Sequence, residues 1–207
     1  CGVGLIASTE GKKSRAIVEY GIEALKAVWH RGAVDADGKT GDGAGIHVEI
    51  PKDFFIEKIQ VTGHNYDNSE ICVGMIFLPR NDYSAQENCK TIVESELTKN
   101  NFSIFGWRQV PVNPKVLVEK AFQTMPEIIQ VLFKSNDPNL LDKNLERKIY
   151  ETRKRIENKA FDASLNNFYI CSISSKSIIY KGLYLAEAIS DFYLDLKDTR
   201  FVSRYAI

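Results

Sequence analysis

The sequence is short of the features that most often assign a function directly. It has three histidines, and their spacing fits no metal-ligand pattern. None of its four cysteines forms a CxxC pair, so neither a zinc site nor a redox motif is indicated. We therefore predict no metal in this chain. A reducing compartment is expected, with Cys72 and Cys171 as buried thiols within apolar runs.

The sequence also lacks an excess of charge and a long apolar run. The 27 basic residues balance 27 acidic ones, which argues against a protein that binds nucleic acid by bulk electrostatics. No apolar run approaches the roughly 18 residues of a membrane span, and no charged-then-apolar leader marks export. We expect no nucleic-acid partner, no membrane partner, and a cytoplasmic or plastid location.

What is present suits one globular domain over residues 1–207, because 44% of the residues are hydrophobic and 26% are charged. Apolar spacing predicts helices at residues 15–30, 84–99, 114–125, 140–160 and 185–192. Strands or extended segments are predicted at residues 2–7, 46–50, 72–78, 102–110, 127–134 and 200–207, and a hairpin joins 169–174 to 177–180. Strict βαβ alternation is missing, which favours an α+β fold with antiparallel sheet.

Two glycine-rich segments imitate phosphate-binding motifs. Gly41-Asp-Gly43-Ala-Gly45 lacks the GxGxxG spacing, and it follows a helix and precedes a strand, the reverse of the required order. Residues 11–14 lack the upstream glycine of a P-loop, because that position is Ile6. The basic residues of the helix at 140–160 alternate with glutamates, which is typical of a solvated helix face.

The first residue, Cys1, could act as a complete catalyst. No Met precedes it, so the sequence is either trimmed or matured to expose it. An N-terminal α-amino group has a pKa of about 7.7–8.0, close to the value of about 8.5 for a thiol. One residue would then supply both nucleophile and base, the cysteine counterpart of N-terminal threonine catalysts. This chemistry needs a free amine and no histidine.

The motifs around this cysteine resemble the start of glutamate synthases. Class II (N-terminal nucleophile) amidotransferases share Cys1 followed by an Arg-Gly pair, and the longer glycine- and aspartate-rich string is similar to glutamate synthase itself. The segments that carry the resemblance are Cys1-Gly2-Val3-Gly4, His30-Arg31-Gly32-Ala33, Ala36-Asp37-Gly38 and Thr40-Gly41-Asp42-Gly43-Ala44-Gly45. Later matches are Gly106-Trp107-Arg108-Gln109-Val110-Pro111, Gln130-Val131 and Tyr180-Lys181-Gly182.

The resemblance implies an αββα four-layer sandwich in which Cys1 begins a central strand. It implies hydrolysis of L-glutamine through a γ-glutamyl thioester on Cys1, giving glutamate and ammonia. In the complete enzyme the ammonia would reach a synthase domain of the same polypeptide and meet 2-oxoglutarate there. That step would use FMN and an iron–sulfur cluster, and a small reductase subunit is a further possible partner. No cofactor is expected in this chain.

The resemblance also implies site residues. Cys1 would be the nucleophile, with Gly2, Arg31, Gly32 and Asp42 around the pocket. Arg31 would orient the loop near Cys1, although an arginine that ends a helix by pairing with backbone carbonyls is an equal interpretation. Asp42 would hold the loop through hydrogen bonds. We assign Trp107 and Arg108 to packing or an interface before substrate contact.

In the family, an arginine that holds the substrate carboxylate and an Asn-Gly oxyanion pair follow the position where this sequence stops. We therefore expect the fold of this chain to be incomplete at its C-terminus, with an open sheet edge. We expect the isolated chain to have little glutaminase activity, since losing one oxyanion donor typically lowers the rate about 10²–10³-fold. Two alternatives stay open: an N-terminal cysteine hydrolase of another amide, and a non-catalytic interaction module.

Overall fold

A computed structural model describes residues 2–34 and 40–207 of the chain. It confirms an α+β fold with two four-stranded antiparallel sheets and flanking helices. The chain divides into two compact units. Unit 1 consists of Cys1–Phe54, Val110–Met125 and Ile179–Ile207, and unit 2 consists of Phe55–Gln109 and Pro126–Ile178. Each unit contains one of the sheets that a sandwich of this class requires.

The sheet of unit 2 is built on long, regular ladders. Its order is β4-β5-β3-β6, with β3 (Cys72–Leu78) and β5 (Glu127–Ser135) in the centre. β3 pairs with β5 along its whole length, and β4 (Phe102–Gln109) and β6 (Tyr169–Ser174) complete the sheet. Side chains on both faces of the central strands are buried.

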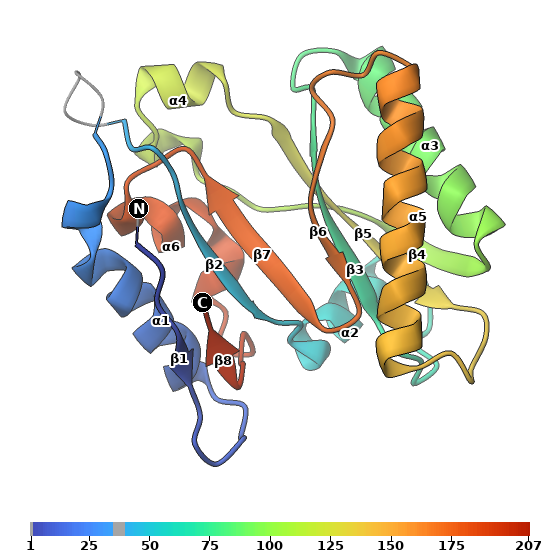
Figure 1. Cartoon of the computed structure of the whole chain (residues 1–207), viewed down its shortest axis with the longest axis horizontal. Helices are drawn as coiled ribbons and strands as arrows, with labels where there is room; N and C mark the ends of the chain where they lie inside the picture. The colour runs from blue at the N-terminus through green and yellow to red at the C-terminus, as the bar shows by residue number, and fades with distance from the viewer. Residues whose placement is uncertain (1, 35–39) are drawn as a thin grey trace. The chain divides into compact units, whose positions relative to one another are not determined.

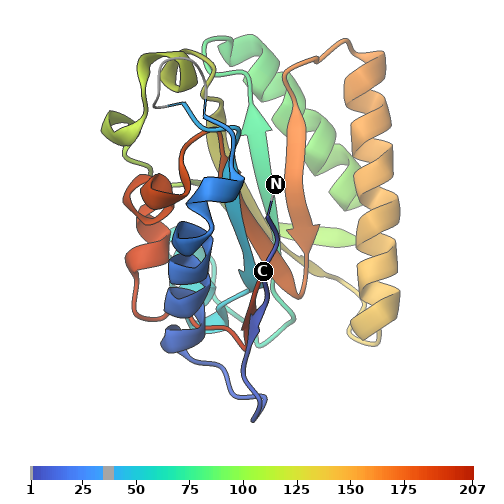
Figure 2. The ribbon, with the colours of Figure 1, turned by 60° about the vertical axis from the view of Figure 1, so that its left-hand side comes forward.

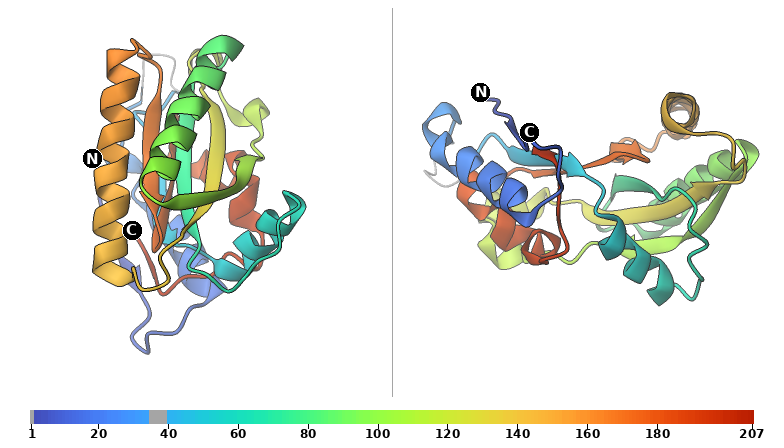
Figure 3. Two further views of the ribbon diagram at one scale, coloured as in Figure 1. Left: turned by 90° about the vertical axis from the view of Figure 1, so that its right-hand side faces the viewer. Right: turned by 90° about the horizontal axis from the view of Figure 1, so that it is seen from below.

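Two helices cover one face of this sheet, α3 (Tyr83–Lys99) and α5 (Asp142–Asp162) (Figures 1 and 3). The Asp82 side chain caps α3 by accepting a hydrogen bond from the Ala85 N–H at 2.9 Å. The helices and strands share one apolar core because their inward positions recur at the helix and strand periods. That core includes Cys72, Ile76, Leu78, Cys89, Val93, Leu97, Phe102, Val131, Phe133, Leu145, Ile149 and Ile156.

The sheet of unit 1 has shorter strands. Its order is β1-β8-β2-β7, and the bounds are β1 Ile6–Ala7, β8 Tyr205–Ala206, β2 Ala44–Glu49 and β7 Ser177–Gly182. Helix α1 (Arg15–Ala27) packs on β1, β2 and β8 (Figure 2). Among the described strands β1 lies at the end of the order, so it is not the central strand that we expected.

A buried carboxylate locks β8 beside β2. Glu49 is 5% exposed and accepts hydrogen bonds from the Arg204 backbone N–H at 2.6 Å and from its guanidinium at 2.6 and 2.9 Å. Burial acts to raise the pKa of Glu49. The Arg204 hydrogen bonds and the charge of Lys13 outweigh burial, so this pKa lies below its usual value. The bonded carboxylate fixes the register of β8.

Most remaining elements are short. They are α2 (Lys52–Val61), η2 (Pro114–Val116), α4 (Glu119–Gln123), η3 (Ala186–Ala188), α6 (Ile189–Phe192) and η4 (Leu194–Lys197). α2 was not predicted from the sequence, and the helix predicted at 114–125 forms only as η2 and α4. Within the described residues, no helix is both long enough and apolar enough to cross a membrane.

The predicted hairpin at residues 169–180 is wrong. Both strands form, but β6 pairs with β3 in one sheet and β7 belongs to the other sheet. The turn between them is held by Glu146 of α5, which accepts hydrogen bonds from the Ser174 hydroxyl and from the Ser175 N–H and hydroxyl at 2.7–2.8 Å. These hydrogen bonds attach the segment between β6 and β7 to α5.

Candidate active site

Helix α1 and the turn after it supply one wall of the candidate site. The Ser14 side chain caps the helix by accepting a hydrogen bond from the Ile17 N–H at 3.4 Å. The helix ends at Ala27, and a 3₁₀ turn (η1, Trp29–Arg31) follows, in which the Arg31 N–H donates to the Val28 carbonyl at 2.9 Å. Arg31 thus ends the helical segment and also faces the site, so both interpretations of this residue stay compatible with the structure.

The glycine- and aspartate-rich loop closes on itself at its base. Val34 and Gly41 form an antiparallel bridge, and the Asp42 N–H donates to the Ala33 carbonyl at 3.1 Å. These bonds bring Asp42 back toward the helix end that carries Arg31. The expected motif Ala36-Asp37-Gly38 lies outside the described residues.

Close packing at the base of the loop requires a glycine at position 41. A Cβ at Gly41 would lie 2.7 Å from the Tyr184 carbonyl oxygen and 3.0 Å from the Leu185 nitrogen. Both neighbours are backbone atoms, which cannot turn aside as a flexible side chain can. Gly41 therefore lets the loop rest directly on the segment that follows β7.

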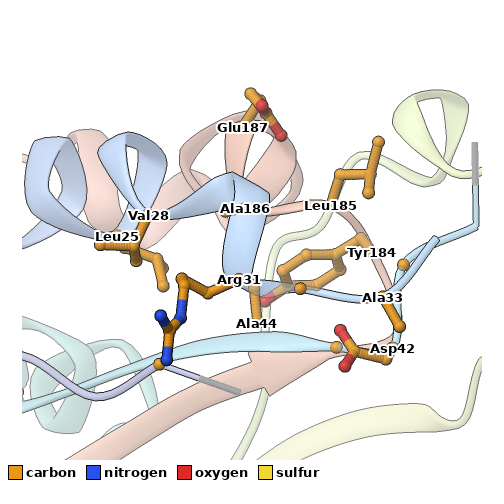
Figure 4. Close-up of a pocket in the computed structure, with 14 residues that line it drawn as sticks. Leu25, Val28, Arg31, Ala33, Asp42, Ala44, Tyr184, Leu185, Ala186 and Glu187 are labelled. Carbon is orange, nitrogen blue, oxygen red and sulfur yellow. The ribbon is translucent and has the colours of Figure 1, made fainter.

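A cavity of about 240 Å³ lies between these segments. Figure 4 shows Arg31 and Asp42 on opposite sides of it, with the Tyr184 ring between them and Glu187 pointing away. Pockets for drug-sized ligands occupy about 300–1,000 Å³, so this one suits a smaller ligand such as a single amino acid. The lining consists of Gly2, Leu25, Val28, Arg31, Gly32, Ala33, Gly41, Asp42, Gly43, Ala44, Tyr184, Leu185, Ala186 and Glu187.

Four of the five predicted site residues come together here. Gly2, Arg31, Gly32 and Asp42 all line the cavity. The fifth, Cys1, lies outside the described residues and directly precedes Gly2 in the sequence. Whether these residues bind substrate stays a prediction.

Trp107 and Arg108 lie elsewhere, in β4 of unit 2. The Trp107 indole N–H donates to Glu94 at 2.7 Å, and the Arg108 guanidinium donates to Gln130 at 2.7 Å. Neither side chain lines the cavity. Their contacts within unit 2 are of the packing kind that the sequence favoured.

The segment from Tyr184 to Glu187 was missed as part of the site. It follows the Tyr180-Lys181-Gly182 match, which was noted for the resemblance alone. The match could have directed attention to the residues just after it. No pattern in the sequence, however, pairs them with the loop that ends at Asp42.

The three described cysteines do not fit the role of nucleophile, because all are buried. Burial, with the charge of Glu146 nearby, raises the pKa of the Cys72 thiol. Burial also raises the pKa of Cys89 to about 11. Since only a thiolate attacks readily, these thiols are inert at neutral pH. Within the described ranges no group of three or more metal-ligating side chains gathers either.

The chain belongs to the class II glutamine amidotransferases, whose family model matches residues 1–207. More particularly, it is 53% identical over its whole length to the glutamate synthase (NADPH) large chain of Azospirillum brasilense, of which it covers 14%. It is 38% identical to ferredoxin-dependent glutamate synthase 1, chloroplastic/mitochondrial, of Arabidopsis thaliana, and 36% identical to ferredoxin-dependent glutamate synthase 2 of Synechocystis sp.. Both matches extend over the whole of this chain and over 13% of each relative. The resemblance drawn from the motifs is thereby confirmed.

Proposed function

We propose that this chain is the glutamine-hydrolysing domain of a glutamate synthase, with Cys1 as its nucleophile. The observation that carries the proposal is the gathering of Gly2, Arg31, Gly32 and Asp42 around one small cavity in a class II amidotransferase. Gly2 directly follows Cys1 in the sequence. Burial raises the pKa of the Cys72 and Cys89 thiols, which supports Cys1 as the nucleophile.

The proposed reaction has two steps. The α-amino group of Cys1, directly or through a water, takes the thiol proton, and the thiolate attacks the γ-carboxamide carbon of glutamine. The C–N bond then breaks, the amine returns the proton to the leaving nitrogen, and ammonia departs from a γ-glutamyl thioester. Water cleaves the thioester to release glutamate and restore the thiol. Arg31 and the glycines shape the wall beside this chemistry.

In the full-length protein the ammonia would pass to a synthase domain and react with 2-oxoglutarate. FMN and an iron–sulfur cluster would serve that domain, with NADPH or ferredoxin as the electron source that the relatives' names mention. Three buried cysteines of the described residues do not come together as iron–sulfur ligands would, namely Cys72, Cys89 and Cys171. The iron–sulfur cluster is therefore assigned to the synthase part of the full-length protein. A small reductase subunit and a cytoplasmic or plastid location belong to the same proposal.

Active-site labelling of the full-length protein tests the proposal. A diazoketone mimic of glutamine should label Cys1 in a peptide map, and excess glutamine should protect it. Cys1→Ala should abolish glutaminase activity, whereas Cys89→Ala, which alters a buried thiol, should leave it intact. An extra residue ahead of Cys1 should also abolish activity, because it removes the free amine.

Each alternative makes a different prediction. A Cys1→Ala protein that still hydrolyses glutamine would overturn the proposal and favour a non-catalytic interaction module. Labelling of Cys1 by other acyl electrophiles, with no labelling by the glutamine mimic, would favour a hydrolase of another amide.

A further inference from the structure

The aromatic ring of Tyr184 forms a wall of the cavity described above. The residue is 4% exposed, although it lines the cavity together with Arg31 and Asp42. In Figure 4 its ring lies between these two side chains. The ring thus contributes aromatic surface to a small cavity whose lining also includes a cation and an anion.

The ring is held firmly from behind. A Cβ at Gly182 would lie 2.5 Å from the Tyr184 ring, so only glycine leaves room for the ring there. The ring of Phe192 packs against it with centroids 5.3 Å apart. Tyr193 packs at 6.3 Å, and its own hydroxyl donates to the Lys181 carbonyl at 2.8 Å. These packing contacts resist displacement of the ring by a larger ligand.

The backbone of Tyr184 is fixed as well. Its carbonyl lies against Gly41, at the closed base of the loop that carries Asp42. The position of the ring is therefore tied to the loop and not only to the segment after β7. Tyr184 and the loop are therefore in direct contact through backbone atoms within unit 1.

We propose that Tyr184 is a specificity-determining residue: its ring limits the cavity to an unsubstituted carboxamide and excludes γ-amides with a substituent on the nitrogen. This inference rests on the proposed function, because it concerns the amide that Cys1 would attack. The consequence is chemical: hydrolysis of an unsubstituted amide releases ammonia, whereas a substituted amide would release an alkylamine.

The test compares two substrates in the full-length protein, glutamine and γ-glutamylethylamide. Tyr184→Leu removes the ring and keeps an apolar side chain, so kcat/KM for the ethylamide relative to glutamine should rise about tenfold or more, the range for one or two carbon atoms in a pocket. Tyr184→Phe removes only the hydroxyl and should leave the ratio within about twofold. Tyr20→Leu, an exposed tyrosine on α1 that is 55% exposed, is the matched control and should leave the ratio unchanged.

Two outcomes would overturn the inference. If Tyr184→Leu lowers kcat/KM for both substrates by one factor, the ring has a structural role only. If Tyr184→Phe changes the ratio as much as Tyr184→Leu, the hydroxyl and not the ring discriminates. Should Tyr184→Leu fail to fold, Tyr184→Met is the second variant, because methionine is close to leucine in volume and has a more flexible side chain. It should also raise kcat/KM for the ethylamide relative to glutamine.

The same assays separate this inference from the proposed function. Alkylation of Cys1 by iodoacetamide should proceed at the wild-type rate in Tyr184→Leu, since the nucleophile is untouched. Glutamine hydrolysis that survives Cys1→Ala would refute the proposed function, whatever Tyr184 does. Hydrolysis that depends on Cys1 with an unchanged substrate ratio would refute only the role of Tyr184.

Discussion

The two units hold their sheets in different ways. In unit 2 the seven residues of β3 pair continuously with β5, and a large apolar cluster packs two long helices on that sheet. In unit 1 two strands have only two residues each, and hydrogen bonds outside the strand ladder support them, among them the three from Arg204 to Glu49. The stability of unit 2 therefore depends most on its apolar core, whereas unit 1 depends more on hydrogen bonds and close backbone contacts.

The largest loss of stability is expected in unit 2, from Leu97→Ala. Leu97 on α3 is fully buried in the apolar cluster. Truncation of a buried leucine typically destabilises by about 2–5 kcal/mol. Hydrogen exchange of the full-length protein should show faster exchange in α3 and α5, with unchanged glutaminase activity per folded molecule. Leu141→Ala, at a position 55% exposed, is the control. Equal effects of the two substitutions would contradict the prediction.

A smaller stability loss with a larger functional effect is expected from Gly41→Ala. The added methyl meets the Tyr184 carbonyl at 2.7 Å, and overpacking of this kind costs about 1–3 kcal/mol. The loop base should open, so exchange should quicken around residues 33–43 and 184–187, and glutaminase activity should fall. Gly4→Ala, where nothing lies within 4 Å of the new Cβ, should be neutral. Wild-type activity in Gly41→Ala would show that the loop base is not needed for the chemistry.

The smallest effect is expected from Glu49→Gln, and it should depend on pH. Losing the charge weakens bonds to the half-exposed Arg204, a loss of about 1 kcal/mol after solvent screening. The pKa of Glu49 is lowered by folding, so its contribution is complete above its ordinary value and is lost as the pH falls through the folded value. Exchange in β2 and β8 should thus differ between variant and wild type at pH 7 and converge on acidification. A difference that grows toward acid pH would reverse the assigned sign.

Local signals in the sequence predicted the structure of unit 2 well. The bounds of β3 are as predicted because apolar spacing defines them. For the same reason α3 differs from the prediction by one residue at its start, and α5 by two residues at each end. α2 was missed, since its buried side chains Phe54, Phe55 and Ile59 are too few to establish a helical period. The hairpin was wrong because β6 and β7 lie in different sheets, next to β3 and β2, which are distant from them in sequence.

For the candidate site, the motifs gave the residues and the structure gave their proximity. Gly2, Arg31, Gly32 and Asp42 were predicted from the resemblance, and they line one cavity. Tyr184 could not be predicted in the same way. Its contact with Gly41 joins segments far apart in the chain, and such a contact depends on packing that no local pattern encodes.

The strand order of unit 1 also bears on how the protein is made. β8 lies between β1 and β2, so the first strand of the chain meets its partner only after residues 205–206 have left the ribosome. At about 5–20 residues per second, that delay is roughly 10–40 s. During this time Val3 and Leu5, which remain 91% and 64% exposed even in the folded chain, offer an apolar segment to chaperones. The strand beside the proposed nucleophile thus joins its sheet only after residues 205–206 have been made.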